Sequence, residues 1–112
     1  MKDVINVDEW KVTLKNFVKQ RNWQNFHNPK NLVMNLSGEA AELMEIYTWV
    51  NSEDSKKTHL NSETKEHIRQ EIGDVFMTLI MLADELDLSL SEALKDKFIL
   101  TAKKYPAKSD NV

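Results

Sequence analysis

Four acidic residues are spaced so that they could hold a metal ion together. Glu39 and Glu42 are three residues apart, and so are Glu71 and Asp74. Residues at positions i and i+3 share one face of an α-helix, so each pair can present two carboxylates to the same point. If the two helices pack together, four carboxylates surround one space. Such oxygen ligands suit a hard divalent cation, and we expect Mg²⁺, with Mn²⁺ as a substitute.

Glu39 occupies a position where an apolar side chain would be expected. At about 100° per residue it falls in the middle of an apolar stripe, and Glu42 falls at the edge of that stripe. The stripe consists of Leu32, Leu36, Leu43, Ile46 and Val50. An ionised carboxylate in a core is costly unless another group compensates for its charge. A bound cation would provide this compensation.

These acidic pairs also have a simpler interpretation, in which the carboxylates are solvated and balance nearby lysines. The chain has 18 Asp and Glu residues, so the spacing arises often by chance. Other metal centres fit less well. There is no cysteine for a thiolate site. His27, His59 and His67 lack the spacing of a transition-metal site, and none of them completes the Glu-x-x-His motif of a di-iron bundle.

The helices that must position these residues can be read from apolar spacings of three and four, with only two Gly and two Pro in the chain. We expect an all-α four-helix bundle. The first helix starts after the N-cap Asp8, and the second runs from Asn28-Pro29 to about Val50. The third helix runs from Ser62 to about Leu86, and the fourth runs from the capping box of Ser89 and Glu92 to about Tyr105-Pro106. The polar segment 51–61 is predicted to be a mobile surface loop.

The helix expected from Ser62 is apolar on nearly its whole circumference between Val75 and Ala83. A helix that is apolar on every face is buried on every face. A four-helix domain of this size has little interior for it, so we expect a homo-oligomer in which this helix packs against its copy. The alternative is a central helix surrounded by the other three within one chain.

Composition indicates which classes of partner to expect. The chain has 112 residues, which suits one domain, and we predict a single domain over 1–112 with flexible ends at about 1–6 and 107–112. The formal net charge of −3 argues against binding a nucleic acid polymer. A nucleotide remains compatible if cations lie between its phosphates and the acids. The sequence contains no recognisable signal peptide or membrane span, so we expect a cytoplasmic protein.

Four short segments resemble one known family. GEAAEL (38–43) and EIGDV (71–75) resemble the E-x-x-E and E-x-x-D motifs of MazG-like nucleotide pyrophosphohydrolases, members of the all-α NTP pyrophosphatase superfamily. RNWQNFHNPKNL (21–32) and KKYP (103–106) are similar to segments of its short, dCTPase-like branch. The segments occur in the family's order, and together they cover nearly the whole chain.

The resemblance implies a four-helix protomer that assembles as a dimer or tetramer. It implies Mg²⁺-dependent hydrolysis of a (deoxy)nucleoside triphosphate to the monophosphate and pyrophosphate, as in the removal of non-canonical or excess dNTPs. The implied metal ligands are Glu39, Glu42, Glu71 and Asp74, and Glu39 or Glu42 is a candidate general base. The candidate substrate contacts are Trp23, His27, Trp49 and Thr101 for the base and Lys30, Lys103 and Lys104 for the phosphates.

Two positions depart from the family pattern. Thr101 stands where the dCTPase-like branch has an asparagine, and a hydroxyl cannot offer a donor and an acceptor side by side as an amide can. Thr78 stands where that branch has an aromatic residue one turn after Asp74. A preference for cytosine is therefore not implied, and a broader base choice is compatible.

Two other functions remain open at this point. A phosphoribosyl-ATP pyrophosphatase would share the architecture and differ in its substrate. A non-catalytic helical interaction module would use the helix from Ser62 as a docking surface and the acids to fix its register. In this second interpretation the lysines and tryptophans have ordinary structural roles.

Overall fold

The computed structural model describes residues 2–108, and every regular element in that range is helical. The elements are α1 (Val7–Gln20), η1 (Gln24–Phe26), α2 (Pro29–Tyr47), α3 (Ser52–Ser55), η2 (Thr58–Leu60), α4 (Ser62–Glu85) and α5 (Leu90–Lys104), where η denotes a 3₁₀ turn. The predicted all-α class is confirmed. None of these helices is both long enough and apolar enough to cross a bilayer. Of the ends predicted to be flexible, Met1 and residues 109–112 lie outside the described range.

Side-chain caps determine where the long helices begin. The Asn28 side chain accepts a hydrogen bond from the backbone N–H of Asn31 (2.9 Å), and proline follows at the first position of α2. The Ser89 hydroxyl accepts from the N–H of Glu92 (3.2 Å) at the start of α5. Both starts agree with the sequence-based expectation.

The start of α1 differs from the expectation. Asn6, rather than Asp8, is the N-cap, because its side chain accepts a hydrogen bond from the N–H of Glu9 (3.1 Å). Asp8 lies inside the first turn, where its negative charge interacts favourably with the helix dipole. Both residue types are good caps, so the sequence alone did not distinguish the two positions.

The segment 51–61, predicted to be a loop without regular structure, contains α3 and η2. The Thr58 hydroxyl donates to the backbone oxygen of Ser55 (3.1 Å). Thr58 has no second hydrogen to give, so the Tyr47 hydroxyl must be the donor in their 3.1 Å contact. This bond joins the segment to the end of α2.

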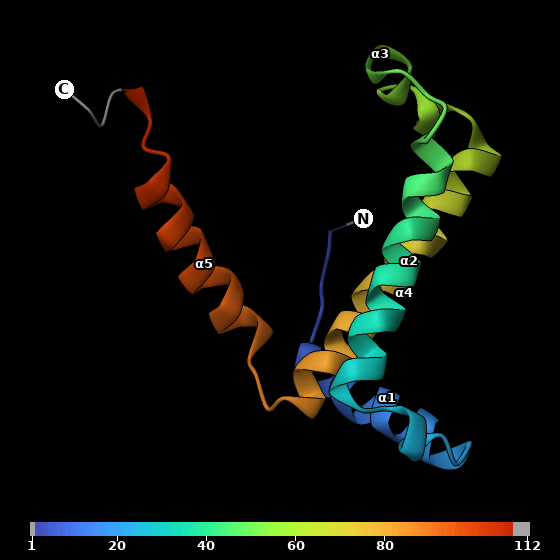
Figure 1. Ribbon diagram of the computed structural model, residues 1–112, viewed down its shortest axis with the longest axis vertical. Helices are drawn as coiled ribbons and strands as arrows, with labels where there is room; N and C mark the ends of the chain where they lie inside the picture. Colours follow the sequence, from blue (N-terminus) through green and yellow to red (C-terminus); the bar gives the residue numbers. More distant parts are fainter. Residues whose placement is uncertain (1, 109–112) are drawn as a thin grey trace.

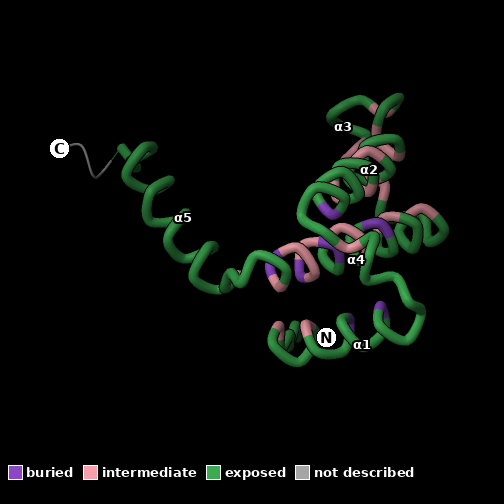
Figure 2. Tube along the Cα trace, turned by 60° about the horizontal axis from the view of Figure 1, so that its bottom comes forward, coloured by how far each residue is buried: buried purple, intermediate pink, exposed green. Residues whose placement is uncertain are grey.

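The core lies where three helices meet. α2 and α4 run antiparallel, and α1 packs across the C-terminal part of α4 (Figure 1). The buried apolar residues are Leu14 and Val18 of α1, Leu32 of α2, and Ile80 and Ala83 of α4. Figure 2 shows that buried positions gather on the facing sides of these helices. Buried Thr78 accepts a hydrogen bond from Asn35 (3.3 Å), which links α4 to α2 one turn beyond Asp74.

The fourth long helix does not join this core. α5 projects away from the other helices (Figure 1), and it contains no buried residue. The chain turns at Asp87, whose φ of 52° is left-handed, and the Lys11 ammonium donates to the backbone oxygen of Leu88 (2.9 Å). The helix forms at its predicted position, but the expected four-helix bundle is not closed within one chain. Periodicity identifies an apolar face without showing which surface covers it.

Candidate metal centre

The four predicted carboxylates converge between α2 and α4. One carboxylate oxygen from each of Glu39, Glu42, Glu71 and Asp74 lies within 4.8 Å of the others. Each pair shares a helix face because its members are three residues apart, and the antiparallel packing of α2 against α4 brings the two pairs together. The arrangement can surround a small cation with oxygen ligands from two directions.

Burial makes this cluster costly in the absence of a cation. Glu71 is only 9% exposed, Glu39 and Asp74 are half-buried, and Glu42 is exposed. Among the described residues, the buried atoms Glu39 Oε2 and Glu71 Oε2 have no hydrogen-bond partner. A buried carboxylate oxygen without a partner is strongly destabilising, and a divalent cation would satisfy both atoms at once. The residues present therefore fit a hard divalent metal ion.

The pKa values of two of these carboxyl groups reflect the same crowding. Burial raises the pKa of Glu39, and the nearby charges of Asp74, Glu42 and Glu71 raise it further. Burial also raises the pKa of Glu71, with smaller contributions from a hydrogen bond and the charge of Glu42 and from the charge of Asp74. The ionised forms of these two carboxyl groups are therefore disfavoured until a positive charge lies close to them.

One cationic candidate lies beside the cluster. His67 Nε2 is 3.6 Å from Glu71 Oε1, one helical turn earlier on α4. This contact opposes the rise in the pKa of Glu71 only in part. The His67 side chain is mostly exposed, so water weakens its interaction with Glu71 and it does not replace a divalent cation.

A cleft of about 570 Å³ opens next to the cluster, within the size range of ligand pockets. Glu42 and Glu71 form one side. The remaining lining residues are Glu45, Ile46, Val50, Lys57, Thr58, Asn61, Thr64 and His67. The cleft thus connects two of the four carboxylates to the segment that carries α3 and η2 and to the first turns of α4.

Lys57 and His67 are cleft residues that the sequence did not single out as substrate contacts. The Lys57 ammonium has no ion pair or hydrogen bond with any described residue, whereas the adjacent Lys56 pairs with Glu53 (3.1 Å). A signal for His67 existed, because it precedes Glu71 by four residues and so shares its helix face. No such signal existed for Lys57, which lies in a segment without periodicity.

The predicted base contacts are not brought together within one chain. Trp23 packs edge-on against Phe17, with ring centroids 5.8 Å apart, just before the start of α2. Trp49 lies beyond the other end of α2 and is 95% exposed. The 19 residues of α2 span about 28 Å, so these two indoles cannot meet on one base.

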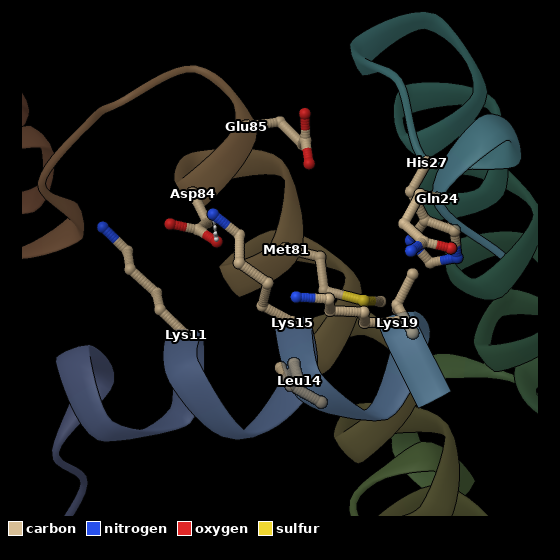
Figure 3. Close-up of a pocket in the computed structure, with 10 residues that line it drawn as sticks. Lys11, Leu14, Lys15, Lys19, Gln24, His27, Met81, Asp84 and Glu85 are labelled. Atoms are coloured by element: carbon tan, nitrogen blue, oxygen red, sulfur yellow. Dashed lines mark ion pairs between the residues drawn. The ribbon is translucent and has the colours of Figure 1, made fainter. Parts of the chain in front are cut away.

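His27 lies in a different cavity, of about 250 Å³, between α1 and the C-terminal end of α4. Figure 3 shows it facing this space together with Gln24, while the Lys15 ammonium pairs with Asp84 (3.5 Å). The remaining predicted contacts are equally dispersed. Lys30 is in the first turn of α2, and Thr101, Lys103 and Lys104 are exposed on the projecting α5.

Comparison with known proteins connects this site to one family. A family model described as the MazG-like family matches residues 35–112, which include all four carboxylates. Human dCTP pyrophosphatase 1 is 30% identical over 91 residues, covering 81% of this chain and 54% of the human protein. The bovine protein of the same name is 29% identical over 90 residues, covering 80% of this chain and 53% of its own length. The chain therefore spans about half the length of these curated relatives.

One solved structure superposes on nearly the whole chain. A crystal structure of a pyrophosphatase from Archaeoglobus fulgidus is 33% identical and superposes with a TM-score of 0.82. The match covers 96% of this chain and 98% of the archaeal chain. The fold, the four-carboxylate site and the matching family model lead to one assignment: the chain belongs to the MazG-like family.

Proposed function

We propose that this protein hydrolyses a nucleoside triphosphate to the monophosphate and pyrophosphate with a divalent cation held by Glu39, Glu42, Glu71 and Asp74. The observation that carries the proposal is the pair of buried carboxylate oxygens, on Glu39 and Glu71, that have no partner among the described residues. Family membership and the names of the relatives, dCTP pyrophosphatase and pyrophosphatase, support the reaction class.

The exposure of the four carboxylates suits them to different roles. When bound, Mg²⁺ or Mn²⁺ would neutralise phosphate oxygens and lower the pKa of an attacking water. Glu39, Glu71 and Asp74 are at least half-buried, so they are suited to holding the ion in a fixed position. Glu42 is exposed and lines the cleft, so it is better placed than Glu39 to accept a proton from water.

The cleft beside Glu42 and Glu71 is our candidate site for the phosphate chain. Lys57 lines this cleft, and its ammonium group pairs with no other described residue. Thr64 and His67 add groups able to bind phosphate oxygens. Lys57, Thr64 and His67 line the same cleft as Glu42 and Glu71, whereas Lys103 and Lys104 lie on α5. Glu45 adds a negative charge to the lining, so cations are needed for a polyphosphate to remain there.

The proposed contacts to the nucleotide base lie at opposite ends of α2. Trp23 and His27 lie near the start of α2, and Trp49 lies past its end. Trp49 and Thr101 could join Trp23 at one nucleotide only if different copies of the chain contribute them. We propose a (deoxy)nucleoside triphosphate as substrate, with removal of excess or non-canonical dNTPs as the role.

The decisive experiment is a pyrophosphate-release assay with Mg²⁺ across the canonical triphosphates, several modified ones and phosphoribosyl-ATP. Turnover of one or more nucleoside triphosphates, lost on chelation, is the expected result. Turnover of phosphoribosyl-ATP alone would instead identify the related pyrophosphatase. No turnover of any compound, combined with no effect of Mg²⁺ or Mn²⁺ on thermal unfolding, would favour the non-catalytic interaction module.

A further inference from the structure

Segment 51–60 is held in place by very few side chains. It contains no buried residue, and only Ser55 and Thr58 are half-buried. Within the described part of the chain, one side-chain hydrogen bond joins this segment to another element, the 3.1 Å contact between the hydroxyl groups of Tyr47 and Thr58. η2 also packs against α4. A segment with so little buried surface depends strongly on each such contact for its order.

Tyr47 belongs to the same helix as two of the proposed metal ligands. It is the last residue of α2 and follows Glu42 by five residues, or about 7.5 Å along the helix axis. Its hydroxyl donates to Thr58, because the Thr58 hydroxyl itself donates to Ser55. The segment lies where α2 ends and α4 begins (Figure 1). The Tyr47 hydroxyl therefore fixes the segment relative to the carboxylates of α2.

Lys57 directly precedes the threonine to which Tyr47 is bonded, and it lines the cleft beside the carboxylates. Three acids line the same cleft, Glu42, Glu45 and Glu71. The Lys57 ammonium nevertheless forms no ion pair with any residue that the structure describes. A lysine that stays unpaired beside three acids keeps its positive charge available to an anion that enters the cleft.

The cleft extends along α4 from the carboxylates toward the start of that helix. Glu71, His67 and Thr64 line it at intervals of about one turn, so the lining covers about 10 Å of α4. The segment that carries Lys57 precedes α4, so the backbone of Lys57 lies at the end of the cleft away from the carboxylates. In the proposed reaction the attacked phosphate lies at the carboxylates, and two further phosphates extend from it. The terminal phosphate is therefore the one nearest to Lys57.

We propose that Tyr47 is a positioning residue that holds Lys57 where it contacts the terminal phosphate of the substrate. This inference rests on the proposed function, because it needs a nucleotide whose phosphate chain lies in the cleft. Lys57 then favours a chain of three phosphates, since a shorter chain does not reach its end of the cleft. The Tyr47 hydroxyl orders the segment before the substrate binds, so binding does not carry the full entropic cost of ordering it.

The first test compares the two products of the proposed reaction as ligands. Isothermal titration calorimetry with Mg²⁺ present measures the affinity for inorganic pyrophosphate and for the four common deoxynucleoside monophosphates. Tyr47→Phe should weaken pyrophosphate binding about five-fold, as expected for one lost hydrogen bond, and should leave monophosphate binding unchanged. A general structural fault would weaken both. The matched control is Tyr105→Phe, because the Tyr105 side chain is exposed beyond the end of α5. This control should bind pyrophosphate as tightly as the native chain does.

The second test shows whether Tyr47 acts through Lys57. Lys57→Ala should weaken pyrophosphate binding about ten-fold, as expected for a lost hydrogen bond to a charged group. Adding Tyr47→Phe should cause little further loss, because the ammonium that Tyr47 positions is already absent. Lys56→Ala should have no effect, since the Lys56 ammonium pairs with Glu53. Additive losses in the double variant would overturn the proposal.

The third test needs no ligand. Hydrogen exchange read by mass spectrometry should show faster exchange in segment 51–61 of Tyr47→Phe than in the native chain. The backbone N–H groups of Ser55, Lys57 and Leu60 are hydrogen-bonded there and report the order of the segment. Exchange within α4 should stay unchanged. Native exchange rates in segment 51–61 of the variant would overturn the proposed role of Tyr47.

The outcomes separate this inference from the proposed function. A native chain that binds no pyrophosphate and hydrolyses no nucleoside triphosphate would overturn both. A native chain that hydrolyses triphosphates, together with a Tyr47→Phe variant that binds pyrophosphate with native affinity, would overturn the inference alone. Equal losses of pyrophosphate and monophosphate binding in Tyr47→Phe would also overturn it, because they would indicate a general change in the fold.

Discussion

The carboxylate cluster and α5 are incomplete in opposite ways. The cluster is formed by one chain and is partly buried, but two of its carboxylate oxygens have no partner among the described residues. α5 is well formed and capped, yet its apolar face has no cover. Secondary structure can thus be complete while electrostatic and hydrophobic requirements are not. A cation would satisfy the first region, whereas the second needs a surface that packs against the apolar face of α5.

The largest effect should come from removing one carboxylate. Glu71→Gln should reduce turnover by more than the roughly 10–100-fold that loss of an outer-shell partner costs at metal sites, because the direct ligand itself is lost. Its helical circular dichroism and its solution mass should stay unchanged. Glu63→Gln, an exposed acid in the first turn of the same helix, is the control and should retain activity. Near-native turnover by Glu71→Gln would exclude the proposed ligand set.

Metal binding should raise stability through the cluster alone. At 100 times the dissociation constant, Mg²⁺ or Mn²⁺ should add about 2.7 kcal/mol to the free energy of unfolding, measured as an upward shift in the melting temperature. The shift should vanish in Glu71→Gln. It should persist in Phe98→Glu, a substitution at an exposed position of α5, since one chain supplies all four carboxylates. Loss of the shift in Phe98→Glu would show that the two regions are not independent.

A smaller effect is expected at the cleft. Lys57→Ala should raise KM for a triphosphate about ten-fold with little change in kcat, as expected if one charge-assisted hydrogen bond to substrate is lost. Lys56→Ala is the matched control, because the Lys56 ammonium already pairs with Glu53 and does not line the cleft. Steady-state kinetics on both variants provides the measurement. Equal effects of the two substitutions would assign the loss to general surface charge.

The smallest effect concerns pH. Because the pKa values of Glu39 and Glu71 are raised, the folded metal-free protein binds protons more readily than the unfolded chain. Its free energy of unfolding should therefore increase as the pH falls from neutral toward those raised values, and decrease as the pH rises. Saturating Mg²⁺ should reverse this slope. Urea unfolding between about pH 5 and 8 tests the sign, and Glu71→Gln should flatten the metal-free slope.

The sequence predicted those features that depend on residues near one another in the chain. The starts of α2 and α5 followed from the caps Asn28 and Ser89, and the meeting of the carboxylates followed from their spacing on two helices. The direction of α5 was not predictable, because neither its capping box nor its apolar stripe specifies what covers that stripe. Lys57 was missed for a related reason. The order of segment 51–61 depends on the Tyr47–Thr58 hydrogen bond rather than on periodicity.

The left-handed turn at Asp87 gives one residue an influence over the direction of the whole of α5. Aspartate tolerates a φ of 52° better than most residues do. The hydrogen bond from the Lys11 ammonium to the backbone oxygen of Leu88 also holds this bend in place. The helix beyond it is about 22 Å long, so a change of about 10° at the elbow would move its far end by about 4 Å. Small substitutions at this bend could therefore change the angle between α5 and the other helices while leaving every carboxylate in place.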